Sequence, residues 1–141
     1  MALKILLVTL NNDDVLDVSD GGDTGIDRAR GVEIIVWKLS GSNLNGAEFA
    51  DETPDGSGFN WIDKSTGIFS QPLLSANRRR MIMEDDHPNA GSAGHWIYML
   101  SVRLRDPDAN GKPVFRTTTN VRGKKRKKDT RTTNNPVIIN R

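Results

Sequence analysis

The segment 95–121 constrains the fold of this chain more than any other part of it. Apolar side chains occupy every second position of its first arm, namely Trp96, Tyr98, Leu100, Val102 and Leu104. This period places the set on one face of a β-strand, whereas a helix would scatter it around its circumference. Turn residues follow (RDPDANGKP), and the second arm (VFRTTTNV) is rich in β-branched side chains. We therefore expect one long antiparallel hairpin whose aromatic face is covered by a second layer.

Short strand patterns recur along the rest of the chain, separated by turn residues, and no segment shows a convincing helical stripe. Strands are expected at 3–10, 32–39, 78–84 and 137–139. Both faces of the first two are apolar, which predicts a covered strand at 3–10 and a central strand at 32–39. The pattern as a whole predicts an all-β, two-sheet antiparallel β-sandwich with an Ig-like or cupredoxin-like Greek key, and a closed barrel is the alternative. The expected core residues are Ile35, Trp37, Trp96, Tyr98, Leu100, Val102 and Phe115.

The length of 141 residues suits a single domain, which we expect to span 1–141. Long polar loops are expected at 11–31 and 40–58, and a basic loop at 122–131. Apolar residues make up only 35% of the chain, so the core should be modest for this length.

The absence of cysteine excludes several classes of protein. Disulfide scaffolds, thiolate zinc sites, iron–sulfur clusters, cupredoxin-type copper sites and cysteine nucleophiles all need that residue. It also favours a reducing compartment, so we expect a cytoplasmic protein. No apolar run approaches the roughly 18 residues of a membrane span. We expect neither a cofactor nor a membrane span.

Charge is unevenly distributed along the chain despite a net charge of only +2. Residues 1–60 carry 4 basic and 11 acidic side chains, whereas residues 61–141 carry 16 basic and 7 acidic ones. The simpler interpretation is that the two halves face each other within one fold. The alternative is a dipolar surface that favours head-to-tail self-association or capture of a polyanion.

Two basic clusters are the candidate polyanion-binding sites. They consist of Arg78, Arg79 and Arg80, and of Lys124, Lys125, Arg126, Lys127 and Lys128. Such clusters can hold phosphates with salt-dependent, sequence-independent affinity. No aromatic residue stands beside the second cluster to stack on bases, so a solvated loop is the simpler interpretation. Nucleic acid is therefore a possible but less expected partner.

Catalytic and metal-binding signals are sparse. His87 with Asp85 and Asp86 is the one combination that would suit a metal-dependent enzyme, but an exposed loop histidine is the simpler interpretation. The residues Asp106–Gly111 match the first half of a calcium loop, but Thr117 stands where the loop needs a bidentate glutamate. A hairpin turn is therefore expected at 106–111, and no metal site is expected.

Together these patterns predict a non-enzymatic soluble module that binds a protein partner or associates with itself. A homo-oligomer is a possible form, because sandwich edges and unequal charge both favour association. Polyanion binding through the Lys/Arg clusters and a metal-dependent enzyme around His87 are the alternatives.

Overall fold

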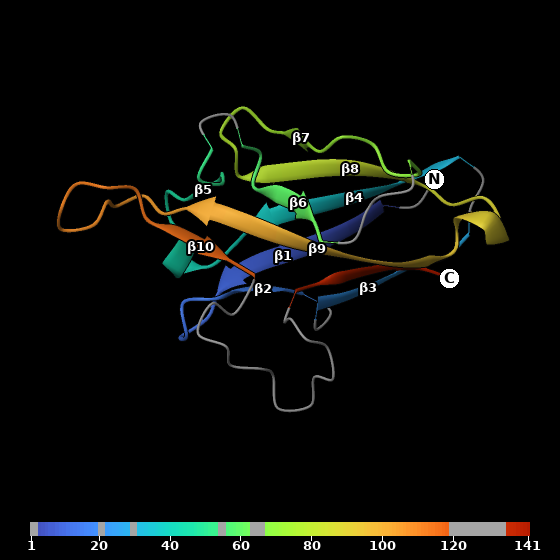
Figure 1. Ribbon diagram of the computed structural model, residues 1–141, viewed down its shortest axis with the longest axis horizontal. Coiled ribbons are helices and arrows are strands. Elements are labelled where there is room, and N and C mark those ends of the chain that lie inside the picture. Colours follow the sequence, from blue (N-terminus) through green and yellow to red (C-terminus); the bar gives the residue numbers. More distant parts are fainter. Residues whose placement is uncertain (1–2, 20–21, 29–30, 54–55, 63–66, 119–134) are drawn as a thin grey trace.

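The computed structural model describes residues 3–19, 22–28, 31–53, 56–62, 67–118 and 135–141, and they form an all-β sandwich. Two sheets pack together around an aromatic core. In Figure 1 the long strand β9 (Gly94–Arg103) of one sheet crosses in front of β4 (Val32–Leu39) of the other. The predicted two-layer architecture is confirmed.

The first sheet has five strands in the order β2-β1-β4-β8-β7. Besides β4, these are β1 (Leu3–Leu10), β2 (Leu16–Val18), β7 (Leu73–Leu74) and β8 (Arg80–Asp86). The strand expected at 32–39 is central in this sheet, as predicted. β7 lies at one edge, where Pro72 just before it costs no ladder hydrogen bond.

The second sheet is built around β9. On one edge of β9, β10 pairs with its C-terminal part and β11 with its N-terminal part, and β3 lies beyond β11. On the other edge β9 pairs with β5 and β6. Its other strands are β3 (Asp23–Ile26), β5 (Glu48–Phe49), β6 (Phe59–Trp61), β10 (Phe115–Thr117) and β11 (Val137–Asn140). The ten-residue β9 therefore anchors four other strands.

Both sheets are mixed, whereas the sequence predicted purely antiparallel ones. The pairs β1·β4 and β11·β3 are parallel. The chain leaves the first sheet after β2, adds β3 to the second sheet and returns as β4. After this crossover, β4 lies beside β1 and runs parallel to it. The Ig-like or cupredoxin-like topology stays a prediction.

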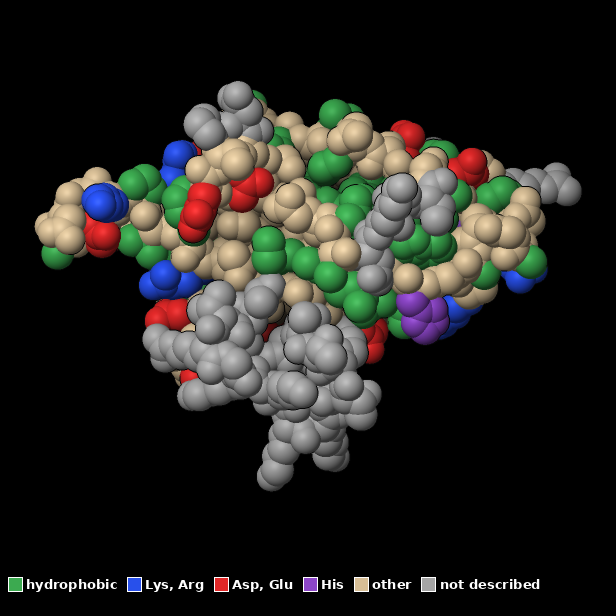
Figure 2. Space-filling model, in the orientation of Figure 1, with side chains coloured by type: hydrophobic (Ala, Val, Ile, Leu, Met, Phe, Trp, Pro, Cys, Tyr) green, Lys and Arg blue, Asp and Glu red, His purple; other side chains and the backbone are tan. Residues whose placement is uncertain are grey.

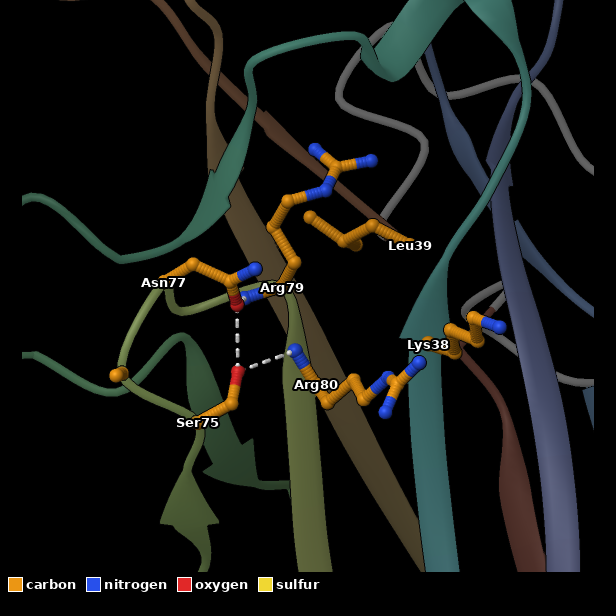
Figure 3. A pocket seen from close by; sticks show the side chains of 7 residues that line it. Lys38, Leu39, Ser75, Asn77, Arg79 and Arg80 are labelled. Carbon is orange, nitrogen blue, oxygen red and sulfur yellow. Dashed lines mark hydrogen bonds between the residues drawn. The ribbon is translucent and has the colours of Figure 1, made fainter.

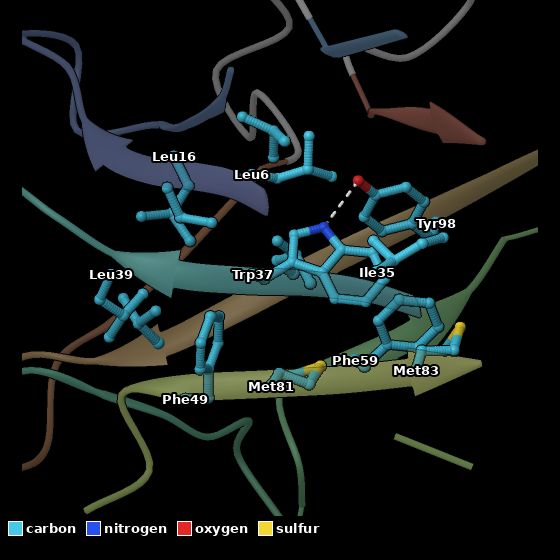
Figure 4. Close-up of a cluster of buried hydrophobic side chains, with 14 of the residues drawn as sticks. Leu6, Leu16, Ile35, Trp37, Leu39, Phe49, Phe59, Met81, Met83 and Tyr98 are labelled. Atoms are coloured by element: carbon cyan, nitrogen blue, oxygen red, sulfur yellow. Dashed lines mark hydrogen bonds between the residues drawn. The ribbon is translucent and has the colours of Figure 1, made fainter. Parts of the chain in front are cut away.

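The core is built from large apolar and aromatic side chains, and Trp37, Tyr98 and Phe49 among them are completely buried (Figure 4). Trp37 Nε1 donates a 2.9 Å hydrogen bond to Tyr98 Oη, so both polar atoms are satisfied inside the core. Phe59 stacks on Tyr98 with ring centroids 5.2 Å apart. Six of the seven predicted core residues are buried. Phe115 is the exception, because it pairs with Arg103 and so lies on the outer face of its sheet, half-buried.

The predicted hairpin is confirmed, with β10 (Phe115–Thr117) as the paired part of its second arm, while residues 119–121 of that arm lie outside the described residues. Phe115, Arg116 and Thr117 pair antiparallel with Arg103, Val102 and Ser101. Asp108 Oδ1 accepts hydrogen bonds from the backbone N–H groups of Asn110 and Lys112, and Gly111 adopts a φ of 75°. The carboxylate that resembled a calcium ligand thus organises the turn.

The expected polar loop at 11–31 contains two strands, β2 and β3. The sequence DTGI of β3 carries little β-propensity. Thr24 and Ile26 are nevertheless buried, because β11 pairs with β3 along its whole length. Tertiary pairing overrides local propensity here.

Helical structure in the described residues is confined to short 3₁₀ segments, which include Ser42–Leu44 and Ala90–Ser92. None of the helices in this part of the chain has the length and apolar character needed to cross a bilayer.

Candidate functional site

Strands of the first sheet send alternate side chains to its two faces, and both faces are apolar. On β4, Ile35 and Trp37 point inward and are fully buried, whereas Ile34 and Val36 point outward. On β8, Met81 and Met83 point inward, and Ile82 points outward. An antiparallel or mixed sheet with one solvated face normally carries polar residues there, so this outer face needs an explanation.

Strand register aligns the outward apolar residues into a row across four strands. Ile5 pairs with Val36, Val36 with Ile82, and Ile82 with Leu73. Ile5 is 56% exposed, Ile82 42% and Leu73 68%. We refer to Ile5, Val36, Ile82 and Leu73 as the apolar row. A contiguous exposed patch of this kind marks an interaction surface more often than scattered apolar residues do.

The apolar row continues along β1. Leu3 is 61% exposed and pairs with Ile34, and Leu7 is 43% exposed. The apolar row with Leu3, Leu7 and Ile34 forms what we call the outer apolar face. The prediction that the strand at 3–10 is covered on both faces is therefore wrong: its inward residues Leu6 and Val8 are buried, and its outward ones are open.

Charges of opposite sign stand at the two ends of the outer apolar face. Lys38 and Arg80 pair across β4 and β8 at one end, and both are exposed. Glu84 and Asp86 are exposed on β8 at the other end. Within the described part of the chain none of the four makes an ion pair. They remain available to charged groups of a partner.

The basic end borders an open pocket of about 480 Å³ between the end of β4 and the turn before β8. Figure 3 shows Lys38 and Arg80 on neighbouring strands, and Ser75 and Asn77 on the turn beside them. Ser75 Oγ bonds to Asn77 Oδ1 at 2.8 Å and accepts the Arg80 backbone N–H at 3.1 Å. These bonds fix the turn, and the Arg80 guanidinium has no hydrogen-bond or ion-pair partner in the described part of the chain.

The three arginines of the basic cluster at 78–80 have different surroundings. Arg78 adopts a φ of 57° in a turn and donates to the carbonyl oxygens of Phe49 and Gly56. Arg79 Nη1 donates to the carbonyl oxygens of Leu44 and Ala47 at 2.8 and 2.7 Å. Two of the three guanidinium groups thus tie main-chain carbonyls of residues 44–49 and of Gly56 to the turn before β8. Among the described residues the Arg80 guanidinium has no partner.

The second basic cluster, Lys124, Lys125, Arg126, Lys127 and Lys128, lies outside the described residues. Its proposed contact with a polyanion stays a prediction.

A group of polar side chains is buried between the sheets at the end of β4 and β8. Glu33 pairs with Asp85 across the two strands, and Asn140 Nδ2 donates to Asp85 Oδ1 at 3.0 Å and to the Ser92 carbonyl at 3.0 Å. All four residues are at most 5% exposed. The acceptors Glu33 Oε2, Asp85 Oδ2 and Asn140 Oδ1 find no donor among the described residues.

His87 belongs to the same buried region, which corrects the expectation of an exposed loop histidine. Its Nδ1 lies 2.7 Å from Ser92 Oγ and its Nε2 lies 2.6 Å from the main-chain oxygen of Arg141. Both ring nitrogens are therefore occupied. Asp86 points to the opposite face of β8, so it cannot share a metal ion with Asp85 and His87. No three His, Asp or Glu side chains of the described residues are grouped to hold a metal ion.

Burial perturbs the two carboxyl groups of this region. It raises the pKa of Glu33 above its ordinary value, and the neighbouring Asp85 carboxylate raises it further. Burial also raises the pKa of Asp85, although the Asn140 hydrogen bond and His87 oppose that shift. A proton on one carboxyl would supply a donor to the unpartnered acceptors, so the arrangement favours a neutral acid.

Ion pairs join the acidic N-terminal half to the basic C-terminal half. Glu48 pairs with Arg103, Asp14 contacts Arg116 at 4.0 Å, and Asp27 contacts Arg141 at 3.8 Å. Figure 2 shows Lys/Arg and Asp/Glu side chains close together at the end formed by the β9–β10 hairpin. This pattern supports the simpler interpretation that the two halves face each other within the fold.

No family model matches the chain, and no curated protein matches it in sequence. The candidate site is therefore defined by its own geometry.

Sequence reasoning missed the outer apolar face. The signal was present, because segments 3–10 and 32–39 are apolar at both odd and even positions. That pattern was interpreted as burial on both faces, which is one of two outcomes it allows.

Proposed function

We propose that the protein is a non-enzymatic structural module that associates with a second copy of itself through the outer apolar face. The apolar row carries this proposal, since Ile5, Ile82 and Leu73 are exposed and their register aligns them across a regular sheet. Covering such side chains removes apolar area from water and supplies the main driving force for association. The cysteine-free chain acts in the cytoplasm under this proposal.

The charges around the face favour a second copy over a strongly charged partner. The face carries two exposed bases at one end and two exposed acids at the other, so it presents no net field of one sign. A nucleic acid or an anionic membrane would meet Glu84 and Asp86 as well as Lys38 and Arg80. A surface with the same composition matches it best.

Ile82→Lys tests this proposal, because it places a charge in the middle of the apolar row. Sedimentation velocity over a range of protein concentrations should show that the unmodified protein self-associates. The variant should have a dissociation constant about a hundredfold higher, because each copy would have to bury the new ammonium group. Exposed Ile82 contributes little to the core, so the variant should fold normally.

Ile62→Lys is the matched control. Ile62 is also an exposed isoleucine (48%), but it follows β6 and does not belong to the first sheet. It should associate like the unmodified protein. A protein that stays monomeric at every concentration, or an Ile82→Lys variant that associates as well as Ile62→Lys, would overturn the proposal.

A further inference from the structure

The outward residues of β8 form an ordered series of base, apolar residue and acid. Arg80, Ile82, Glu84 and Asp86 occupy successive outward positions, and Ile82 lies in the apolar row. Arg80 and Glu84 therefore stand one position to either side of the row, about 7 Å along the strand from Ile82 in each direction. Lys38 strengthens the basic side, because it pairs with Arg80 across β4.

Two copies that stack these faces about a two-fold axis can do so in two simple ways, because such an axis must lie in the plane of the interface. An axis parallel to the strands keeps each position along the strands, so the acidic end of one copy lies over the acidic end of the other, and the basic end over the basic end. When that axis runs along β8, Glu84 stands against Glu84 and Arg80 against Arg80. An axis across the strands reverses the strand direction of the second copy. It places the acidic end of each copy over the basic end of the other.

We propose that two copies stack their outer apolar faces about a two-fold axis that runs along the apolar row, so that Glu84 of each copy pairs with Arg80 of the other. Ile82 then packs against Ile82 on the axis. Leu3 of each copy faces Leu7 of the other, since these residues flank Ile5 on β1. The sheets pack face to face as layers of a sandwich do. This arrangement rests on the proposed self-association and adds its orientation.

Charge reversal separates the two orientations. In Arg80→Glu and in Glu84→Arg, both cross-interface pairs become repulsive when the axis runs across the strands. Each single variant should raise the dissociation constant about tenfold or more at low salt. High salt should narrow that difference, because the charges lie at the rim of an exposed face. Arg105→Glu is the control for net charge, since Arg105 lies beyond β9 next to Asp106.

Two combinations should restore association. The double variant Arg80→Glu/Glu84→Arg exchanges acid and base within each copy and should associate like the unmodified protein. An equimolar mixture of the two single variants should form a heterodimer, because one copy then carries two acids and the other two bases.

The outcomes distinguish the orientation from self-association itself. If the unmodified protein is monomeric, the proposed function fails. Suppose instead that it associates and that neither single reversal weakens association more than Arg105→Glu does. Self-association then stands and this orientation is overturned, because with an axis parallel to the strands neither single variant gains a repulsive contact. Weakening in both single variants with recovery in the double variant supports the orientation.

Discussion

The two faces of the first sheet carry similar apolar side chains but have opposite surroundings. On the inner face, Trp37 and Met83 are completely buried beneath the second sheet. On the outer face, Ile82 directly precedes Met83 on β8, and Ile5 lies on β1 beside β4. Both isoleucines are exposed. The comparison shows that apolar residues on a strand face predict that another surface packs against that face. They do not identify whether that surface is a second sheet or a partner.

The comparison is sharpest between two neighbouring isoleucines of β4. Ile35→Ala should lower the free energy of unfolding by about 2 to 5 kcal/mol, because it opens a cavity in a fully enclosed core. Ile34→Ala should cost about 1 kcal/mol or less in the monomer, because its side chain points away from that core. Urea denaturation at low protein concentration measures both. Equal costs would show that the outer face is covered within a single copy.

A second comparison lies within the arginine cluster. Arg79→Ala should cost about 1.5 to 3 kcal/mol in unfolding free energy, because a charged donor that serves two carbonyl oxygens is lost. Arg80→Ala should change stability by less than about 0.5 kcal/mol, because its guanidinium is exposed and unpaired in the described structure. The same denaturation experiment ranks them. A larger loss for Arg80 would contradict these different roles.

The buried carboxyl pair makes the inner face sensitive to pH. The raised pKa of Asp85 means that the folded state holds a proton more tightly than the unfolded state. This contribution to stability is therefore complete below the unfolded pKa and is lost as pH rises through the raised folded pKa. The isosteric variant Asp85→Asn removes it and supplies a donor. It should gain stability relative to the unmodified protein as the pH rises above the ordinary aspartate pKa of about 3.9.

Urea titrations at several pH values measure that difference. Asp86→Asn is the control, because Asp86 is exposed on the opposite face of the same strand. If the unfolding free energies of Asp85→Asn and the unmodified protein differed by the same amount at every pH, the raised pKa of Asp85 would be contradicted.

The smallest effect should come from the outer face of β1. Ile5→Thr keeps a β-branched side chain and should change the monomer's unfolding free energy by less than about 0.5 kcal/mol, because Ile5 is already 56% exposed. Thermal unfolding of dilute protein provides the measurement. A loss comparable with that of Ile35→Ala would mean that a segment of the same chain covers β1.

Much of the architecture could be predicted from local patterns. Period-two burial in β9 identified the strand, its inward face and its turn, because the sequence DPDANGKP lies between two β-forming arms. The strand β3 could not be predicted, since its sequence DTGI gains its structure from pairing with β11, more than a hundred residues later. The burial of His87 likewise depends on Ser92 and Arg141 closing around it.

The candidate site was only partly predictable. The cluster at 78–80 was recognised as basic, but the sequence could not show that Arg78 and Arg79 reach backbone carbonyls of the 44–56 segment. Arg80 acquires its surroundings from β4 and from the turn before β8, which place Lys38 and Ser75 beside it.

Alternation along the chain by itself determined that this protein is a layered β-structure, since side chains of successive residues must point to opposite faces of a strand. Only the tertiary structure decided which of the two apolar faces of the first sheet is sealed. The second sheet packs on one face, and register gathers Ile5, Val36, Ile82 and Leu73 into a row on the other. Neighbours across a sheet are set by strand order and register, and neither is encoded in any single strand.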